Sequence, residues 1–227
     1  MKTKALIFIS LLPVAISARS QDSSSSFFPM KEGTMIEMTN YNKAGIEQGK
    51  NVTTVLSVKK TTTGTLVKLK SESDARNSGP MEYTAKCDGK SFSISMKSFI
   101  PASMQRVDGG SEMTVDAGDL IYPNSLSVGD RLNDGMVTLN VTMGTMTMKT
   151  VINIRNRVVT GKETLKTKAG TYDCFKIEYD IETTGMSNMK IMSKVKQWVA
   201  KGVGTVKSET YNTKGELTGY SQLTYLK

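Results

Sequence analysis

The sequence predicts an all-β protein, with a single antiparallel domain of about a dozen strands curled into a half-barrel or roll. Three observations favour this class. Apolar and polar residues alternate with a period of two in the informative segments, as in strands that bury one face and expose the other. Turns rich in glycine and asparagine separate these segments. No long segment has the 3.6-residue apolar period of an amphipathic helix.

The first twenty residues have the features of a secretory signal peptide. Lys2 and Lys4 provide a positive start, and residues 5–16 are apolar but too short to span a membrane. Small residues fit a cleavage site after Ser20, with cleavage after Ser17 as the alternative. We therefore expect an exported protein, periplasmic or extracellular. No other stretch is apolar enough to be a transmembrane segment, and the absence of a cysteine near the cleavage site predicts no lipid anchor.

The mature chain is expected to form one domain. The polar, serine-rich residues 21–26 are predicted to be a disordered leader, and the β domain is predicted to span 27–227. All-β folds of about 200 residues commonly form one domain. No linker-like stretch divides this one.

In the first half of the chain, a first strand is expected to run through Ile36 to Tyr41. Residues 81–87 alternate and are followed by Asp88-Gly89 and by a second alternating run, 92–96. An Asp-Gly pair between two such runs predicts a β-hairpin. Residues 98–107 allow one or two helical turns, and 120–130 are predicted to be irregular loop with a short strand.

In the second half, apolar residues occupy odd positions over 137–143 and even positions over 146–154. Gly144-Thr145 lies between them and fits a two-residue turn, so we predict a hairpin there rather than a bulge. Further strands are predicted at 175–182, 191–199 and 205–211, with a last strand ending at Leu226.

The charge of the chain does not indicate nucleic-acid binding. The formal net charge is +9, and removal of Lys2, Lys4 and Arg19 with the signal peptide lowers it by three to +6. The remaining basic residues are scattered along strands and do not alternate with aromatic residues as in a stacking platform. We interpret them mainly as a solvated sheet face, with attraction to anionic envelope material as the alternative.

The residue types also argue against an enzyme. The chain contains no histidine, which removes Ser-His and Cys-His nucleophile pairs, histidine metal sites and the commonest acid–base residue. Gly202-Val203-Gly204 lies between predicted strands, unlike a phosphate-binding loop. We therefore predict no catalytic residues, no metal and no cofactor.

Methionine is the most unusual feature of the composition, with fifteen residues against six phenylalanines and one tryptophan. Met143, Met146 and Met148 are candidates to line a ligand groove, because the flexible thioether adapts to varied apolar shapes. The alternatives are a closed core and, less favoured without histidine, a Cu(I) site.

Trp198 is a further ligand-lining candidate, because it shares its predicted strand face with Lys194 and Lys196. The competing interpretation is packing beneath Phe27-Phe28 or a crossing loop. The two cysteines, Cys87 and Cys174, are predicted to form a disulfide, since exported chains usually oxidise such a pair.

Three segments resemble a family of exported Bacteroidota proteins described as TapB-like and related to a periplasmic domain of unknown function. They are residues 28–34 (Phe-Pro-Met-Lys-Glu-Gly-Thr), 169–174 (Ala-Gly-Thr-Tyr-Asp-Cys) and 198–207 (Trp-Val-Ala-Lys-Gly-Val-Gly-Thr-Val-Lys). The resemblance implies a single antiparallel β domain, curled like a half-barrel, outside the cytoplasm. It implies no activity and no site residues.

Two functional hypotheses follow, and a third, an unrecognised hydrolase, is less favoured. In the first, a non-enzymatic envelope protein holds an apolar or amphipathic ligand on the concave side of its sheet. In the second, the domain is a structural module that docks on another envelope protein or on glycan. A cavity that opens onto Met and Phe side chains favours the first hypothesis, and a sealed core with an exposed aromatic patch favours the second.

Overall fold

The computed structural model describes residues 26–74, 79–100, 111–185 and 189–227, and it contains thirteen strands in one antiparallel sheet. The order of the strands is β6-β8-β9-β10-β11-β12-β13-β1-β2-β3-β4-β5-β7. The predicted all-β antiparallel fold is therefore confirmed. The strands are β1 (Met35–Asn42), β2 (Glu47–Thr61), β3 (Gly64–Ser73), β4 (Met81–Cys87), β5 (Ser91–Ser95), β6 (Ser111–Ala117), β7 (Asp119–Pro123), β8 (Gly135–Met143), β9 (Met146–Thr167), β10 (Gly170–Thr184), β11 (Lys190–Ala200), β12 (Gly204–Tyr211) and β13 (Leu217–Leu226).

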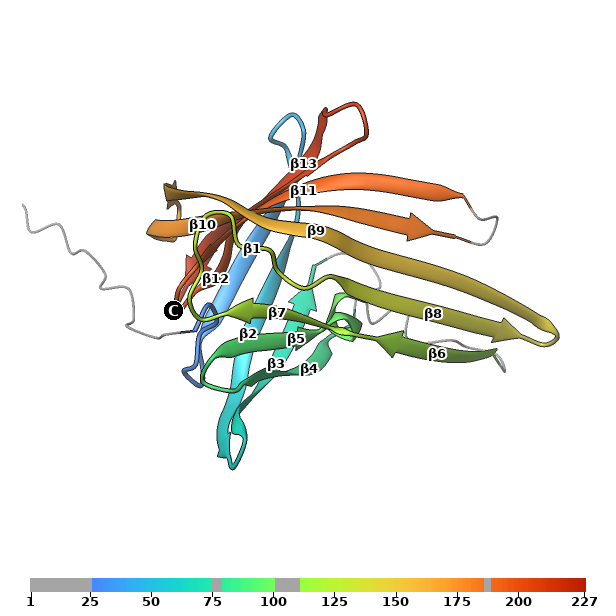
Figure 1. The fold of residues 1–227 in the computed structure, drawn as a ribbon, viewed down its shortest axis with the longest axis horizontal. Coiled ribbons are helices and arrows are strands. Elements are labelled where there is room, and N and C mark those ends of the chain that lie inside the picture. Colours follow the sequence, from blue (N-terminus) through green and yellow to red (C-terminus); the bar gives the residue numbers. More distant parts are fainter. Residues whose placement is uncertain (1–25, 75–78, 101–110, 186–188) are drawn as a thin grey trace, which may run out of the picture.

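The sheet curls until its two edge strands come close to each other. The edges are β6 and β7, which are neighbours in the sequence and are separated by Gly118 alone. At this junction Gly118 N donates to Met136 O, and Gly118 O accepts from Met96 N, both at 2.9 Å. The result is a nearly closed barrel from which the β8–β9 and β10–β11 hairpins project to one side (Figure 1).

The predicted turns are largely found. Asp88-Gly89 lies in the connection between β4 and β5, where the Asp88 carboxylate accepts hydrogen bonds from the backbone N–H groups of Lys90 and Ser91. Met143 pairs with Met146 across the two-residue turn predicted at Gly144-Thr145. The register between β8 and β9 is continuous from this turn onward, so the parity change comes from the turn and not from a bulge.

Several predicted segments lie partly or wholly outside the described residues. These are the signal peptide at 1–20, most of the leader, and most of the helical turns at 98–107, of which a short 3-10 helix, Met96–Phe99, is described. Ser26 is buried, and its carbonyl accepts from Gly202 N at 2.8 Å, so the last leader residue belongs to the fold. Within the described residues, no helix has the length and apolarity to cross a membrane.

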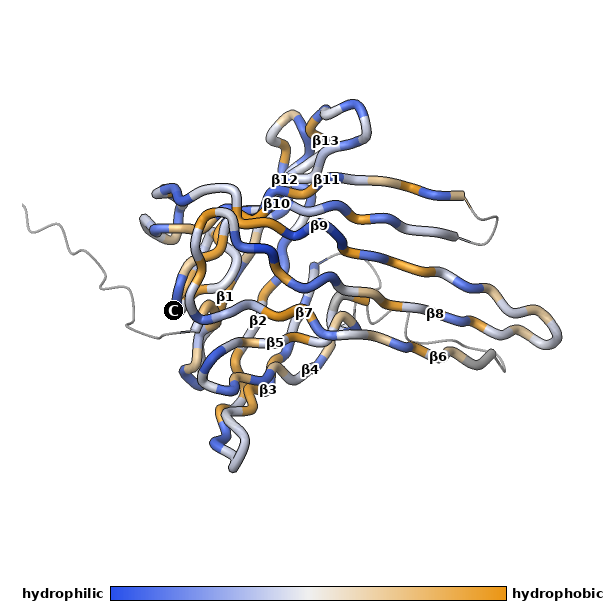
Figure 2. Tube along the Cα trace, in the orientation of Figure 1, coloured by the Kyte–Doolittle hydropathy of each residue, from blue (hydrophilic) through white to orange (hydrophobic). Residues whose placement is uncertain are grey.

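Two apolar clusters hold the sheet together, and apolar and polar residues alternate along its strands (Figure 2). The larger cluster fills the inside of the curl and includes Val67, Leu69, Ile177 and Phe27. The smaller one surrounds Trp198. Burial of these side chains follows the period-two pattern of the sequence, since successive residues of a strand point to opposite faces.

The free edge of β7 is covered by side chains instead of another strand. Asn133 Oδ1 accepts from Ile121 N at 2.8 Å, and Asn133 Nδ2 donates to Asp119 O at 2.8 Å. Arg157 Nη1 donates to Ile121 O at 3.3 Å. An unprotected edge strand is a template for aggregation. The carboxamide of Asn133 makes backbone hydrogen bonds at this edge that a neighbouring strand would otherwise make.

Candidate functional site

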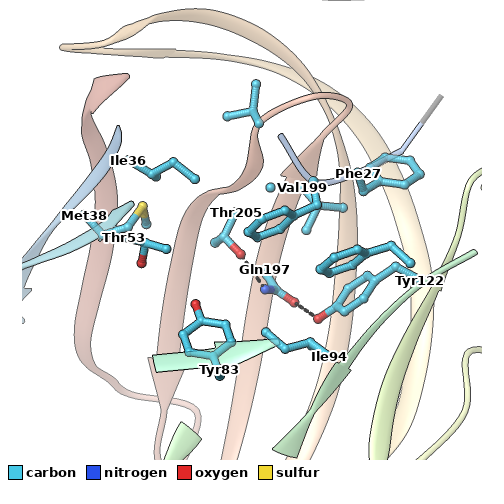
Figure 3. A pocket seen from close by; sticks show the side chains of 14 residues that line it. Phe27, Ile36, Met38, Thr53, Tyr83, Ile94, Tyr122, Gln197, Val199 and Thr205 are labelled. Atoms are coloured by element: carbon cyan, nitrogen blue, oxygen red, sulfur yellow. Dashed lines mark hydrogen bonds between the residues drawn. The ribbon is translucent and has the colours of Figure 1, made fainter. Parts of the chain in front are cut away.

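The inside of the curl contains a cavity of about 200 Å³. Its walls come from the N-terminal segment and from strands on both sides of the curl. The lining side chains of these elements point into the cavity (Figure 3). It is lined by Phe27, Phe28, Ile36, Met38, Thr53, Tyr83, Phe92, Ile94, Tyr122, Gln197, Val199, Val203, Gly204 and Thr205.

One wall of the cavity is aromatic. The Phe28 ring stacks on the Phe92 ring with 4.6 Å between centroids. Phe27 packs edge-on against Phe175 at 5.8 Å. The residues before β1 thus form part of the wall, and the chain passes close to Gly204, where an added Cβ would contact Phe27 O at 3.7 Å. Such a surface suits an alkyl chain or a ring.

A short chain of polar groups runs beside the aromatic wall (Figure 3). Gln197 Nε2 donates to Thr205 Oγ1 at 2.7 Å, and Tyr122 OH donates to Gln197 Oε1 at 3.3 Å. Burial raises the pKa of the Tyr83 hydroxyl, which lies on the same lining. All these groups are neutral, and no charged side chain is among the lining residues. The cavity is therefore amphipathic and uncharged at its surface.

A cation lies behind the polar side of the cavity. The Arg157 guanidinium sits over the Tyr122 ring, 4.7 Å from its centroid, and only 1% of the Arg157 side chain area is exposed. Tyr179 lies next to both residues, and its pKa is raised by burial and by Tyr122, with the charge of Arg157 acting in the opposite direction. The alternating pattern of the sequence does not indicate this arginine, because its inward direction depends on a bulge.

The methionine candidates do not line this cavity. Met143 and Met146 face each other near the turn of the β8–β9 hairpin, with 45% and 69% of their areas exposed. Met148 is half-buried on the same hairpin. Met38 is the methionine that does line the cavity. Binding of an apolar ligand by the hairpin methionines stays a prediction.

Trp198 is buried, with 6% of its area exposed, in the smaller apolar cluster. It packs with Tyr172 and Leu165 from the β9–β10 hairpin, and its Nε1 donates to Glu163 Oε2 at 3.2 Å. Lys176, hydrogen-bonded to Glu163, lowers the pKa of that carboxyl. The ring therefore packs against side chains of the neighbouring strands of its own sheet, and it does not line the cavity.

The predicted disulfide is wrong. Cys87 and Cys174 are both free and buried. Cys87 ends β4, whereas Cys174 is near the start of β10, and six strands separate β4 from β10 in the sheet. Cys174 belongs to the cluster around Trp198, and its pKa is raised to about 12 by burial and by the nearby Asp173 and Glu163 carboxylates.

The described residues contain no group of three or more His, Cys, Asp or Glu side chains that could hold a metal ion.

The sequence pattern did not indicate two of the cavity-lining residues, Tyr122 and Gln197. Tyr122 falls in the segment predicted to be irregular, and Gln197 is a polar residue on an inward strand face. They are recognised as lining residues only because the fold brings them into contact at the cavity.

Fold and cavity together define a single-sheet antiparallel β-roll with a small amphipathic interior site. The DUF3108-like family model matches residues 31–223, and the chain belongs to this family, whose domain has no assigned function. No curated protein matches the chain at a significant level. The predicted relation to a domain of unknown function is thereby confirmed, and the narrower TapB-like assignment stays a prediction.

Two crystal structures are similar to this one. A Bacteroides fragilis protein described as exported, with a YmcC-like fold, has 26% identity and a TM-score of 0.71, and the match covers 89% of this chain and 99% of that one. A Parabacteroides distasonis protein described as a lipoprotein has 24% identity and a TM-score of 0.72, with 91% and 100% covered. Export and the absence of a lipid anchor in this chain stay predictions.

Proposed function

We propose that the protein is a non-enzymatic envelope protein that binds a small amphipathic ligand inside its β-roll. The observation that supports this proposal most strongly is the cavity, which joins the stacked Phe28 and Phe92 rings to the Gln197–Thr205 hydrogen bond. Ligand sites typically combine an apolar lining with a few convergent polar groups. The apolar part of the ligand lies along the phenylalanines, and its polar end faces Gln197 and Tyr122.

The size of the cavity limits what it holds. A dry apolar cavity of ~150 Å³ accommodates benzene. The volume of about 200 Å³ therefore fits one short alkyl chain or one ring. A longer acyl chain would have to extend through an opening of the cavity.

Calorimetric titration with 1-octanol tests the proposal. We expect saturable binding with a negative heat-capacity change, as for burial of apolar surface. Ile94→Phe places a larger side chain on the cavity wall and should abolish binding. The matched control is Ile191→Phe, since Ile191 is 57% exposed on β11 and should leave binding unchanged. A wild type that binds no octyl probe, or an Ile94→Phe variant that folds and binds equally well, would contradict the proposal.

A second candidate function is docking on another envelope protein. It is favoured by the exposed apolar side chains on the two projecting hairpins, namely Met143, Met146, Met189, Ile191 and Met192. Both hairpins project to the same side of the molecule (Figure 1). Replacement of Met146 and Met189 by glutamate should abolish docking without any effect on octanol binding, which separates the two functions.

A further inference from the structure

Arg157 is directed into the roll by an irregularity in β9. Two residues, Asn156 and Arg157, stand opposite Tyr179 where the register between β9 and β10 shifts. Asn156 has a φ of 58°, a left-handed value that is uncommon outside glycine. Its backbone N–H donates to Asp134 and its side-chain amide to Asp180, so the bulge is held in place. Bulges re-aim side chains and are common beside functional sites.

The guanidinium of Arg157 has more hydrogen-bonding capacity than the fold uses. Nη1 makes all the hydrogen bonds in which this side chain engages, with Ile121 O and with the carbonyl and carboxamide oxygens of Asn133. Nε and Nη2 are buried and have no partner. No ion pair of Arg157 is found among the described residues. The structural role at the β7 edge therefore accounts for one of three nitrogens.

A buried charge of this kind is costly. Burial of an unpaired cation carries a large desolvation penalty, and native proteins nearly always pair such groups. The nearby carboxylates, Asp134 and Asp180, accept hydrogen bonds from Asn156 and lie beyond ion-pair distance of Arg157. The neutral lining of the cavity supplies no counter-charge either. A bound anion is the chemical group that would compensate the guanidinium.

We propose that the ligand of the cavity carries a single carboxylate, and that Arg157 binds this group through Nε and Nη2. The proposal rests on the amphipathic-ligand function above and specifies its class as a short-chain carboxylic acid. Tyr122 lies between the cavity and the guanidinium, and its bond to Gln197 is long for an O–H···O contact. On binding, Tyr122 gives up this bond and turns aside, and the acid forms the side-on, two-nitrogen contact typical of Arg–carboxylate pairs.

Calorimetry with octanoate, 1-octanol and octylamine at about pH 7 and low ionic strength tests this assignment. Octanoate should bind at least ~10-fold more tightly than 1-octanol, because charge-assisted hydrogen bonds are the stronger ones. Octylamine should bind most weakly. Equal binding of octanoate and 1-octanol would overturn the carboxylate assignment and leave the amphipathic-ligand function standing. Failure of all three to bind would defeat that function itself.

Asn133→Asp provides a variant that keeps Arg157. The Asn133 Oδ1 atom is already 3.2 Å from Arg157 Nη1, so a carboxylate there would neutralise the guanidinium from within the protein. The preference for octanoate over 1-octanol should then fall to about 1-fold. Asn140→Asp is the control: it makes the same change on β8, where Asn140 contacts Thr114, and should keep the preference. An undiminished preference in a folded Asn133→Asp variant would overturn the role of Arg157.

A measurement on the wild type covers the case in which Asn133→Asp does not fold. The carboxyl carbon of ¹³C-labelled octanoate, bound to the protein, is followed by NMR as the pH is lowered. Pairing with Arg157 predicts that the bound carboxyl has a lower pKa than the free acid. A bound carboxyl with a higher pKa than the free acid would show burial without a cation and would overturn the assignment.

Discussion

The Phe28 ring lies parallel to the Phe92 ring, with planes 4° apart and centroids at 4.6 Å. Phe28 precedes β1, which lies in the middle of the sheet order, whereas Phe92 belongs to β5, next to the edge strand β7. The N-terminal segment therefore crosses the inside of the curl and supplies a wall that the sheet itself lacks. Removal of this segment should open the cavity.

Phe28→Ala tests this wall. The variant should lower the free energy of unfolding by about 1–3 kcal/mol, less than for a fully buried phenylalanine because Phe28 is only half-buried. The enlarged cavity should bind alcohols with a branched chain, or with a chain longer than octyl, better than the wild type does. Urea denaturation and calorimetry measure the two effects. An unchanged free energy of unfolding and an unchanged chain-length preference would show that Phe28 is not part of the wall.

Asn133→Ala should expose the edge of β7. The change removes the hydrogen bonds to Ile121 N and Asp119 O, and we expect a loss of about 1–2 kcal/mol in the free energy of unfolding. Faster aggregation should accompany it, since the edge is then unprotected. Asn140→Ala, which removes one 3.3 Å bond, is the control and should cost less than ~0.5 kcal/mol. Equal stability of the two variants would contradict the edge-capping role.

The free cysteines predict a specific result in thiol titration. Denatured, unreduced protein should yield two thiols per chain, because Cys87 and Cys174 are not bridged. The folded protein should react slowly, since both thiols are buried and the pKa of Cys174 is raised to about 12, which leaves almost no thiolate at neutral pH. A denatured, unreduced chain without reactive thiols would contradict the free cysteines and support a disulfide between them.

Glu163 should contribute to the acid sensitivity of the protein. Its pKa in the folded state lies below that of an ordinary glutamate, chiefly because the carboxylate accepts a hydrogen bond from Lys176. A lowered folded-state pKa gives stability that is present above the unfolded pKa and is lost as the pH falls through the folded pKa. Glu163→Gln should therefore flatten the fall in stability between about pH 5 and about pH 3. Parallel pH profiles for wild type and variant in urea denaturation would refute this contribution.

The sequence was sufficient for several of the strands and turns. Alternation along residues 81–87 and the parity change at Gly144-Thr145 correspond directly to β4 and to the β8–β9 turn. Such patterns are local, and they follow from the geometry of a strand. The class of the fold could therefore be predicted from residues close together in the chain.

The site could not be predicted in this way, because its parts are distant in the sequence. Phe28, Phe92 and Gln197 come from three separate regions and meet only through the curl of the sheet. The direction of Arg157 depends on a bulge that interrupts the alternation of β9. The predicted disulfide between Cys87 and Cys174 failed for the same reason, since strand order, not export alone, decides which cysteines meet.

The central claim, binding inside the roll, is tested most directly by methyl NMR of protein labelled with ¹³C at the methionine methyl groups. Met38 lines the cavity, whereas Met146 lies exposed on the β8–β9 hairpin, so one spectrum reports on both places. Met38→Leu and Met146→Leu assign the two signals. On titration with octanoate we expect the Met38 signal to shift and saturate while the Met146 signal stays in place. A shift of Met146 with Met38 unchanged would contradict the account and place the ligand on the hairpin.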